Sequence, residues 1–167
     1  MQTELTLSIG GLPPMSARGC TQELTAIPQG EFHRTINGDL IFVGNPIHKY
    51  KSVIRCQDQS VIATEGFRVG DVVHVGCIQP LSQKIDPSEE SITLTRVAVP
   101  NSVYVVKENN EEYPRFSSNS QMITLHEQHG TLFAFFRPKL NMRVTSFTLT
   151  TDEWKMKAGW VLELDEV

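Results

Sequence analysis

Short runs of strand-forming residues, separated by turn formers, limit the folds open to this chain more than any other feature. The runs are rich in Val, Ile, Thr and Phe, and they are interrupted by Gly, Pro, Asn and Asp. No stretch repeats apolar residues at the i, i+3, i+4 and i+7 positions of an amphipathic helix. The sequence therefore predicts an all-β fold, an antiparallel β-sandwich or barrel with at most one or two short helical turns.

The clearest hairpin signal is Asn37-Gly38, which stands between two β-forming runs. Both central residues of a type I′ turn need positive φ, and Asn and Gly adopt it most readily. A Gly-Asn-Pro sequence at residues 44–46 then breaks the chain before the next run. We expect residues 36–43 and 50–56 to pair as antiparallel strands.

Near the C-terminus, Trp160, Leu162 and Leu164 alternate with one apolar and two acidic residues. This period of two predicts a strand with one face in the core and the other in solvent. Residues 122–125 and 131–136 flank a Gln-His-Gly sequence, which predicts a further hairpin.

Residues 150–155 are the one place where we expect a helical turn. A Thr can cap the turn there, and Asp152 and Glu153 suit its N-terminal end.

The chain of 167 residues is long enough for a single β domain with a sizeable core. If the domain subdivides, the polar stretch at residues 82–90 is where we expect the boundary. For residues 107–121 the sequence predicts an exposed loop or arm, because too little of the segment is apolar to hold it in a core.

The middle of this segment differs from its polar ends. Tyr113, Arg115 and Phe116 are residue types enriched at interface cores, and Pro114 limits the backbone freedom that ordering would remove. We expect the segment to project from the domain and dock on a neighbouring subunit, with a solvated loop as the alternative.

The composition of the chain disfavours several classes of function. The net charge is −4 and Lys and Arg are scattered singly, which disfavours nucleic-acid binding. No apolar run has the roughly 18–20 residues of a membrane-spanning helix, and the first ten residues do not form a secretory signal.

The chain has three cysteines, Cys20, Cys56 and Cys77. Their number is odd and no two of them form a Cys-x-x-Cys motif. We therefore expect three unpaired thiols and folding in a reducing cytosol.

Motifs for catalysis or cofactor binding are absent. His126 and His129 are the only local His pair, but on a β segment they point to opposite faces and have no third ligand nearby. The sequence contains no Gly-x-Ser-x-Gly and no phosphate-binding loop. Cys20 follows Arg18-Gly19, yet no local base accompanies it. We therefore expect no catalytic, cofactor or metal site, and a protein that is not an enzyme.

Several segments together carry a resemblance. They are Arg-Thr-Ile-Asn-Gly-Asp-Leu at 34–40, the runs at 49–56 and 70–77, Phe-Arg-Pro-Lys-Leu-Asn-Met at 136–142, Asp-Glu-Trp at 152–154, and the run at 159–164. This combination resembles a group of small virion proteins encoded among the structural genes of tailed bacteriophages, over most of the chain except about residues 87–129.

The resemblance implies a β-rich structural subunit of the tail or tail tip. Such a subunit is made in the host bacterial cytoplasm, ends up in the virion, and has itself and other virion proteins as partners in a symmetric oligomer. Two alternatives stay open, namely a head decoration or neck protein, and a monomeric β-barrel module that binds a small ligand or carbohydrate.

Overall fold

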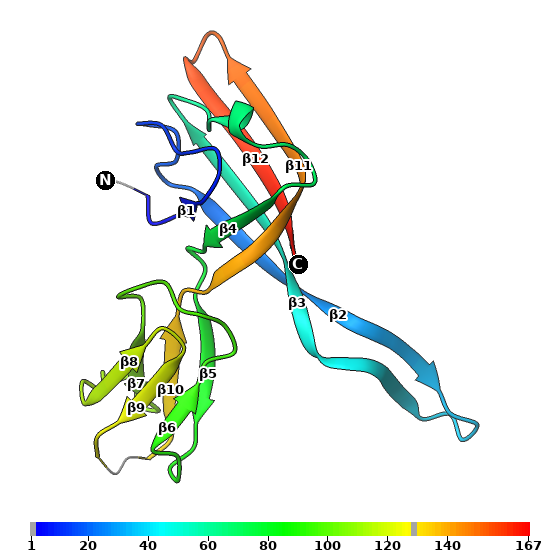
Figure 1. Ribbon diagram of the computed structural model, residues 1–167, viewed down its shortest axis with the longest axis vertical. Coiled ribbons are helices and arrows are strands. Elements are labelled where there is room, and N and C mark those ends of the chain that lie inside the picture. Colours follow the sequence, from blue (N-terminus) through cyan, green and yellow to red (C-terminus); the bar gives the residue numbers. More distant parts are fainter. Residues whose placement is uncertain (1–2, 128–129) are drawn as a thin grey trace. The chain divides into compact units, whose positions relative to one another are not determined.

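The computed structural model describes residues 3–127 and 130–167, and within them the chain is built almost entirely of antiparallel strands (Figure 1). The helical content of these residues is one 3-10 turn, Thr64–Gly66. None of their helices has the length and apolar character needed to cross a membrane. The predicted all-β class is confirmed.

The chain folds into two compact units. Unit 1 contains the N-terminal residues up to Ser8 and His74–Leu140, and unit 2 contains Ile9–Val73 and Asn141–Val167. The chain therefore passes between the units after residues 8, 73 and 140, and residues 82–90 are not a boundary. The polar composition of that stretch was misleading, because Ile85 within it is fully buried.

Unit 1 is a small sandwich of two three-stranded sheets. One sheet has the order β5-β10-β7, formed by Leu81–Ile85, Leu132–Phe136 and Tyr104–Lys107. The other has the order β6-β9-β8, formed by Ser91–Thr93, Met122–Leu125 and Phe116–Asn119. Side chains from both sheets share one core. In the same unit β1 (Thr6–Leu7) pairs with the end of β4 (Val72–Gly76).

The predicted hairpin of residues 122–125 and 131–136 is wrong. Both strands exist, but β9 pairs with β6 and β8, whereas β10 pairs with β5 and β7. Ile123 from one sheet and Leu132 from the other enter the core that the two sheets share. The Gln-His-Gly sequence indicated a turn between β9 and β10. It could not indicate which strands each of them pairs with. Gln128 and His129 lie outside the described residues.

Unit 2 contains four neighbouring strands of the largest sheet in the order β11-β12-β3-β2. Their bounds are Lys139–Asp152, Lys157–Glu166, Leu40–Asp58 and Thr21–Arg34. Trp160, Leu162 and Leu164 are all buried, which confirms the predicted C-terminal core strand. The Trp160 indole Nε1–H donates a hydrogen bond to the Ser16 carbonyl at 2.6 Å, so the segment before β2 packs on this face.

Two local predictions in unit 2 are wrong. Residues 36–43 and 50–56 do not pair with each other, because Leu40–Asp58 is one continuous strand that pairs with β2. Residues 150–155 do not form a helical turn. β11 runs through Asp152, whose carboxylate then accepts the N–H groups of Trp154 and Lys155 at 3.1 Å each and closes the turn into β12.

Candidate functional site

Strands β2 and β3 continue well past the rest of their sheet. β12 pairs with β3 only over residues 51–58, so residues 29–47 form a two-stranded hairpin without a further strand on either side in the described chain (Figure 1). We call this hairpin the arm. A two-stranded hairpin on its own is at best marginally stable in water, which makes the arm the most unusual element of the fold.

The turn of the arm lies at Asn37-Gly38, as the sequence predicts, but it is not of type I′, because only Gly38 and not Asn37 has a positive φ. Gly38 has a φ of 87°, and its N–H donates to the Thr35 carbonyl at 2.9 Å. The Thr35 N–H in turn donates to the Asp39 carbonyl at 2.9 Å. The Arg34 guanidinium donates to the Gly38 carbonyl at 2.9 Å and covers the turn. The position of the Asn-Gly hairpin turn is therefore confirmed, although its type is not and the strands that it joins are longer than expected.

A pair of glycines lets the strands continue where the sequence suggested a break. Gly30 lies opposite Gly44 in the ladder, and a Cβ added to either would collide with the backbone of the other strand. Pro46 lies beyond the residues that pair with β12, so its missing N–H removes no hydrogen bond to that strand. Gly30, Gly44 and Pro46 therefore allow β2 and β3 to continue as a paired ribbon, and they do not end either strand.

Both faces of the arm carry apolar side chains. Directly opposite residues of an antiparallel pair lie on the same face, so Phe32 and Phe42 share one face and their ring centroids are 5.2 Å apart. The other face carries Ile41 and Val43, opposite His33 and Glu31. Apolar groups on both faces of a strand are expected where both faces are covered.

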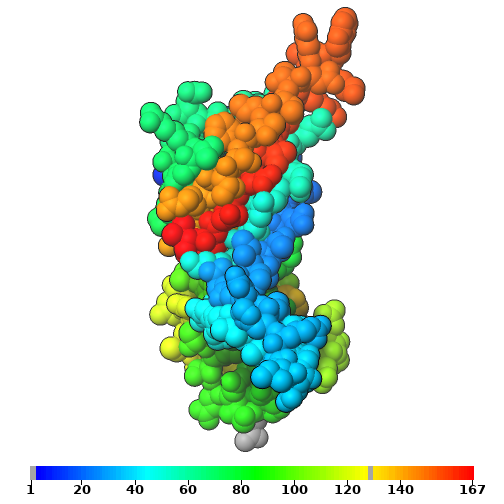
Figure 2. Space-filling model, turned by 90° about the vertical axis from the view of Figure 1, so that its right-hand side faces the viewer, coloured from blue at the N-terminus to red at the C-terminus, as the bar shows by residue number. Residues whose placement is uncertain are grey.

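These apolar side chains are exposed to solvent instead. Phe32 is 63% exposed, Ile36 at the turn is fully exposed, and the others of the set are Leu40, Ile41, Phe42, Val43 and Ile47. Together they expose on the order of 800 Å² of apolar surface, about the area that one partner contributes to a standard protein interface. Figure 2 looks onto the end of the arm (blue to cyan).

The edges of the arm have little of the protection that exposed strands usually carry. Lysines, prolines, β-bulges and inward-pointing charges are the common devices against unwanted pairing. The arm has Pro46 and the bulge between Ile27 and Gln29, both near its base. Residues 29–47 contain no lysine, and their charged groups are Glu31, Arg34 and Asp39, with His33 3.7 Å from Glu31. An unprotected apolar ribbon is typical of a segment that pairs or packs with another chain.

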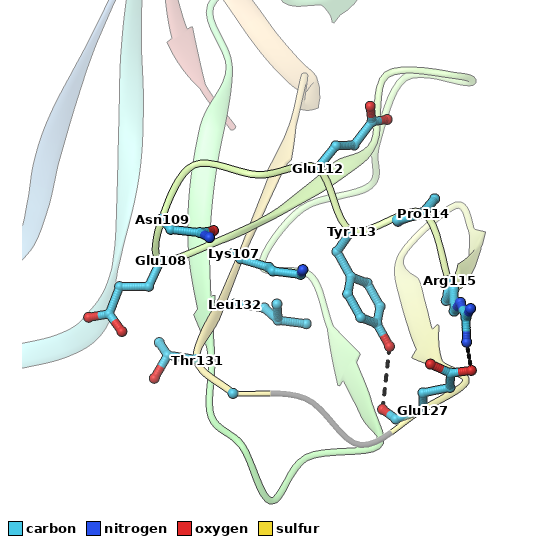
Figure 3. Close-up of a pocket in the computed structure, with 11 residues that line it drawn as sticks. Lys107, Glu108, Asn109, Glu112, Tyr113, Pro114, Arg115, Glu127, Thr131 and Leu132 are labelled. Atoms are coloured by element: carbon cyan, nitrogen blue, oxygen red, sulfur yellow. Dashed lines mark hydrogen bonds and ion pairs between the residues drawn. The ribbon is translucent and has the colours of Figure 1, made fainter.

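The segment that the sequence suggested as an interface has a different role. Tyr113 is buried in the core of unit 1, its N–H donates to the Val105 carbonyl at 2.8 Å, and Phe116 packs against the same core. Figure 3 shows the Tyr113 hydroxyl donating to the Glu127 carbonyl and Arg115 paired with the Glu127 carboxylate. Docking through Tyr113 and Phe116 is therefore wrong, because Tyr113 is buried in its own unit and Phe116 packs against the same core. Residues 107–121 are largely exposed, as predicted, but they do not project as an arm, since β8 within them pairs with β9.

The hollow beside these residues has a volume of about 590 Å³ and is lined by groups such as Lys107, Glu112 and Thr131 (Figure 3). His126 donates its backbone N–H to the Arg115 carbonyl, while His129 lies outside the described residues. Across residues 3–127 and 130–167, no three His, Cys, Asp or Glu side chains gather as a metal site.

None of the three cysteines is in a disulfide. Cys56 and Cys77 are buried and Cys20 is half-buried, with its thiol donating to the Ala17 carbonyl at 3.2 Å.

Sequence analysis missed the arm as a functional element, although a signal was present. Residues 40–43 read Leu-Ile-Phe-Val, four apolar residues in succession. A strand of this kind places apolar groups on both faces, and a hairpin strand with turn residues at both ends has little of its own chain to cover them.

No protein-family model matches this chain, and neither does any curated protein sequence. Fold and site together define a class, an antiparallel all-β protein in two units with a projecting apolar arm.

Proposed function

We propose that this protein is a non-enzymatic structural subunit of a larger assembly, and that copies of it associate through the arm into a symmetric oligomer. The observation that carries the proposal is the arm itself, with apolar side chains exposed on both faces and at the turn. In a monomeric ligand-binding module the apolar side chains of this ribbon would stay exposed to solvent, whereas an assembling subunit buries them against a partner.

The more specific proposal is a subunit of the tail or tail tip in a tailed-phage virion. It is supported by the resemblance to small virion proteins of this kind of the segments 34–40, 49–56, 70–77, 136–142, 152–154 and 159–164. A density map of the whole particle tests this part, because a tail subunit occupies the tail, a decoration protein the head, and a neck protein the junction between them.

Molar mass in solution tests the assembly proposal. We expect the wild-type protein to form a multiple of its 18.8 kDa chain mass by light scattering. The double variant Phe32→Ser/Ile41→Ser removes one apolar group from each face of the arm and should lower the mass toward that of a single chain. The matched control is Val69→Ser/Val97→Ser, which removes two equally exposed apolar residues elsewhere and should keep the wild-type mass.

A wild-type protein that stays a single chain up to high micromolar concentration would contradict the proposal. So would an arm variant that assembles as well as the control.

A further inference from the structure

Two of the three cysteines lie opposite each other where β2 begins. The ladder between β2 and β3 pairs Gln22 with Ile54. Two residues further out in the same register, Cys20 comes opposite Cys56 and lies on the same face as that pair. Directly opposite residues of an antiparallel pair have Cα atoms about 4.5–5.5 Å apart, which falls within the span of about 4.4–6.8 Å that a disulfide bridges.

Contacts on the other side of the two cysteines keep this register. The next opposite pair outward is Arg18 and Asp58, and the Arg18 backbone N–H donates to the Asp58 carboxylate at 2.9 Å. The Arg18 guanidinium holds the same carboxylate at 2.7 Å. Cys20 and Cys56 therefore lie between a ladder pair and an ion pair, and these two pairs fix their spacing.

The thiols of both cysteines point to one turn. The Cys20 thiol donates to the Ala17 carbonyl at 3.2 Å, and the Cys56 thiol donates to the Arg18 carbonyl at 3.5 Å. These two carbonyls belong to consecutive residues. Burial raises the pKa of the Cys56 thiol, and a hydrogen bond with the Cys20 side chain acts against that rise. The two sulfur atoms are therefore neighbours.

The three cysteines differ in their access to solvent. Cys20 is half-buried, Cys56 is 7% exposed, and Cys77, which belongs to unit 1, is fully buried. A dissolved reagent therefore reaches Cys20 first. Cys56 lies behind it as the second thiol of the pair.

We propose that Cys20 and Cys56 form a reversible disulfide when the protein meets a low-molecular-weight disulfide such as oxidised glutathione. The Cys20 thiolate attacks one sulfur of the glutathione disulfide, whose S–S bond breaks. A mixed disulfide forms on Cys20, and the first glutathione leaves as a thiolate that takes up the proton Cys20 lost. The Cys56 thiolate then attacks the Cys20 sulfur and releases the second glutathione, which takes up the Cys56 proton. Two protein thiols are oxidised and one glutathione disulfide is reduced to two thiols.

The disulfide fastens the segment before β2 to β3. That segment already packs on the core through the Ser16 carbonyl, which accepts the Trp160 indole N–H, and Trp160 lies directly opposite Cys56 in the ladder of β12 on β3. In a reducing cytosol the two cysteines stay as thiols, and they join in an oxidising environment. The inference concerns a single chain and does not depend on the proposed assembly function.

Thiol mapping of the folded protein tests the pairing. The protein is reduced, freed of reductant, incubated with a mixture of reduced and oxidised glutathione, then denatured in acid and alkylated. We expect one alkylated thiol per chain and a peptide that joins Cys20 to Cys56 within a single chain. Cys56→Ala should stop at one glutathione on Cys20, whereas the matched control Cys77→Ala should form the disulfide as the wild type does. Unfolding midpoints measured with reductant show that both variants fold.

Two comparisons show whether the fold itself places the pair. At the same ratio of reduced to oxidised glutathione, the native chain should favour the disulfide over the thiols by at least about tenfold more than the chain unfolded in urea. Oxidation should also raise the unfolding midpoint by roughly 5–15 °C, and reductant should reverse the shift.

The other outcomes overturn the inference. They are three alkylated thiols after oxidation, a disulfide that contains Cys77 or joins two chains, and a pair that forms as readily in urea as in the native protein. An oxidised protein with the same midpoint as the reduced one would equally contradict it. The mass of the assembled protein does not enter any of these results, so the proposed function stands or fails separately.

Discussion

Truncating Leu162 to Ala should destabilise unit 2 strongly. Leu162 is 1% exposed, and in the ladder it lies between Ile54 of β3 and Phe147 of β11. Removing a fully buried Leu side chain costs about 2–5 kcal/mol, against a total free energy of unfolding of about 5–15 kcal/mol. For a chain of this size, 1 kcal/mol corresponds to about 2–4 °C, so we expect the unfolding midpoint to fall by roughly 5–15 °C.

Trp160 fluorescence is a suitable probe, because its indole is buried two residues away on the same face. The exposed Trp154 is first replaced by Phe so that it does not contribute. Glu163→Ala is the matched control, since Glu163 is partly exposed and forms a surface ion pair with Lys51 at 3.0 Å. Such pairs contribute at most about 1 kcal/mol. A Leu162→Ala shift no larger than that of the control would refute the assignment of this face to the core.

Two further predictions concern individual side chains. Hydrogen bonds from the Arg18 side chain hold the pKa of the Asp58 carboxyl well below its usual range. The ionised carboxylate therefore stabilises the fold above the usual carboxyl pKa of about 4, and this contribution is lost as the pH falls through the lowered value. Asp58→Asn should lower the unfolding midpoint at neutral pH, with a gap to wild type that narrows below about pH 4; an unchanged gap in acid would refute this. All three thiols should be alkylated in denaturant without reductant, and two fewer would indicate a disulfide. In the native protein Cys20 should react before Cys56, because burial raises the pKa of the Cys56 thiol.

Local periodicity was enough to predict the fold class and the C-terminal core strand. Trp160, Leu162 and Leu164 alternate without interruption, and each meets a buried or half-buried partner across the ladder. The position of the Asn-Gly turn was equally predictable, because Gly38 adopts a positive φ without distant contacts. The type I′ geometry was wrong, since Asn37 does not have a positive φ.

Turn-forming residues were misleading where tertiary context decides their role. Gly44 suggested the end of a strand, but opposite Gly30 it allows a close approach of two backbones. The polar ends of residues 107–121 suggested a projecting arm, but the rings of Tyr113 and Phe116 pack in or against the core and hold that segment on its own unit. Residues far away in sequence decide which residue lies opposite a glycine and where an aromatic ring packs. Local sequence patterns carry no information about those distant residues.

The candidate site was only partly predictable for the same reason. The run of four apolar residues at 40–43 indicated a strand that needs cover on both faces, and the exposed Trp154 lay in a segment for which we expected a helical turn. That the arm continues past the rest of its sheet follows only from the register of β12 on β3.

Hydrogen–deuterium exchange tests most directly whether the arm is buried in an assembly. The protein is compared at a concentration where it is a single chain and at one where it is assembled. We predict that the backbone amides of residues 29–47 exchange rapidly in the dilute protein and at least tenfold more slowly in the assembled one, while those of the edge strand β8 keep their rates. Arm amides that exchange equally fast in both states would contradict the account.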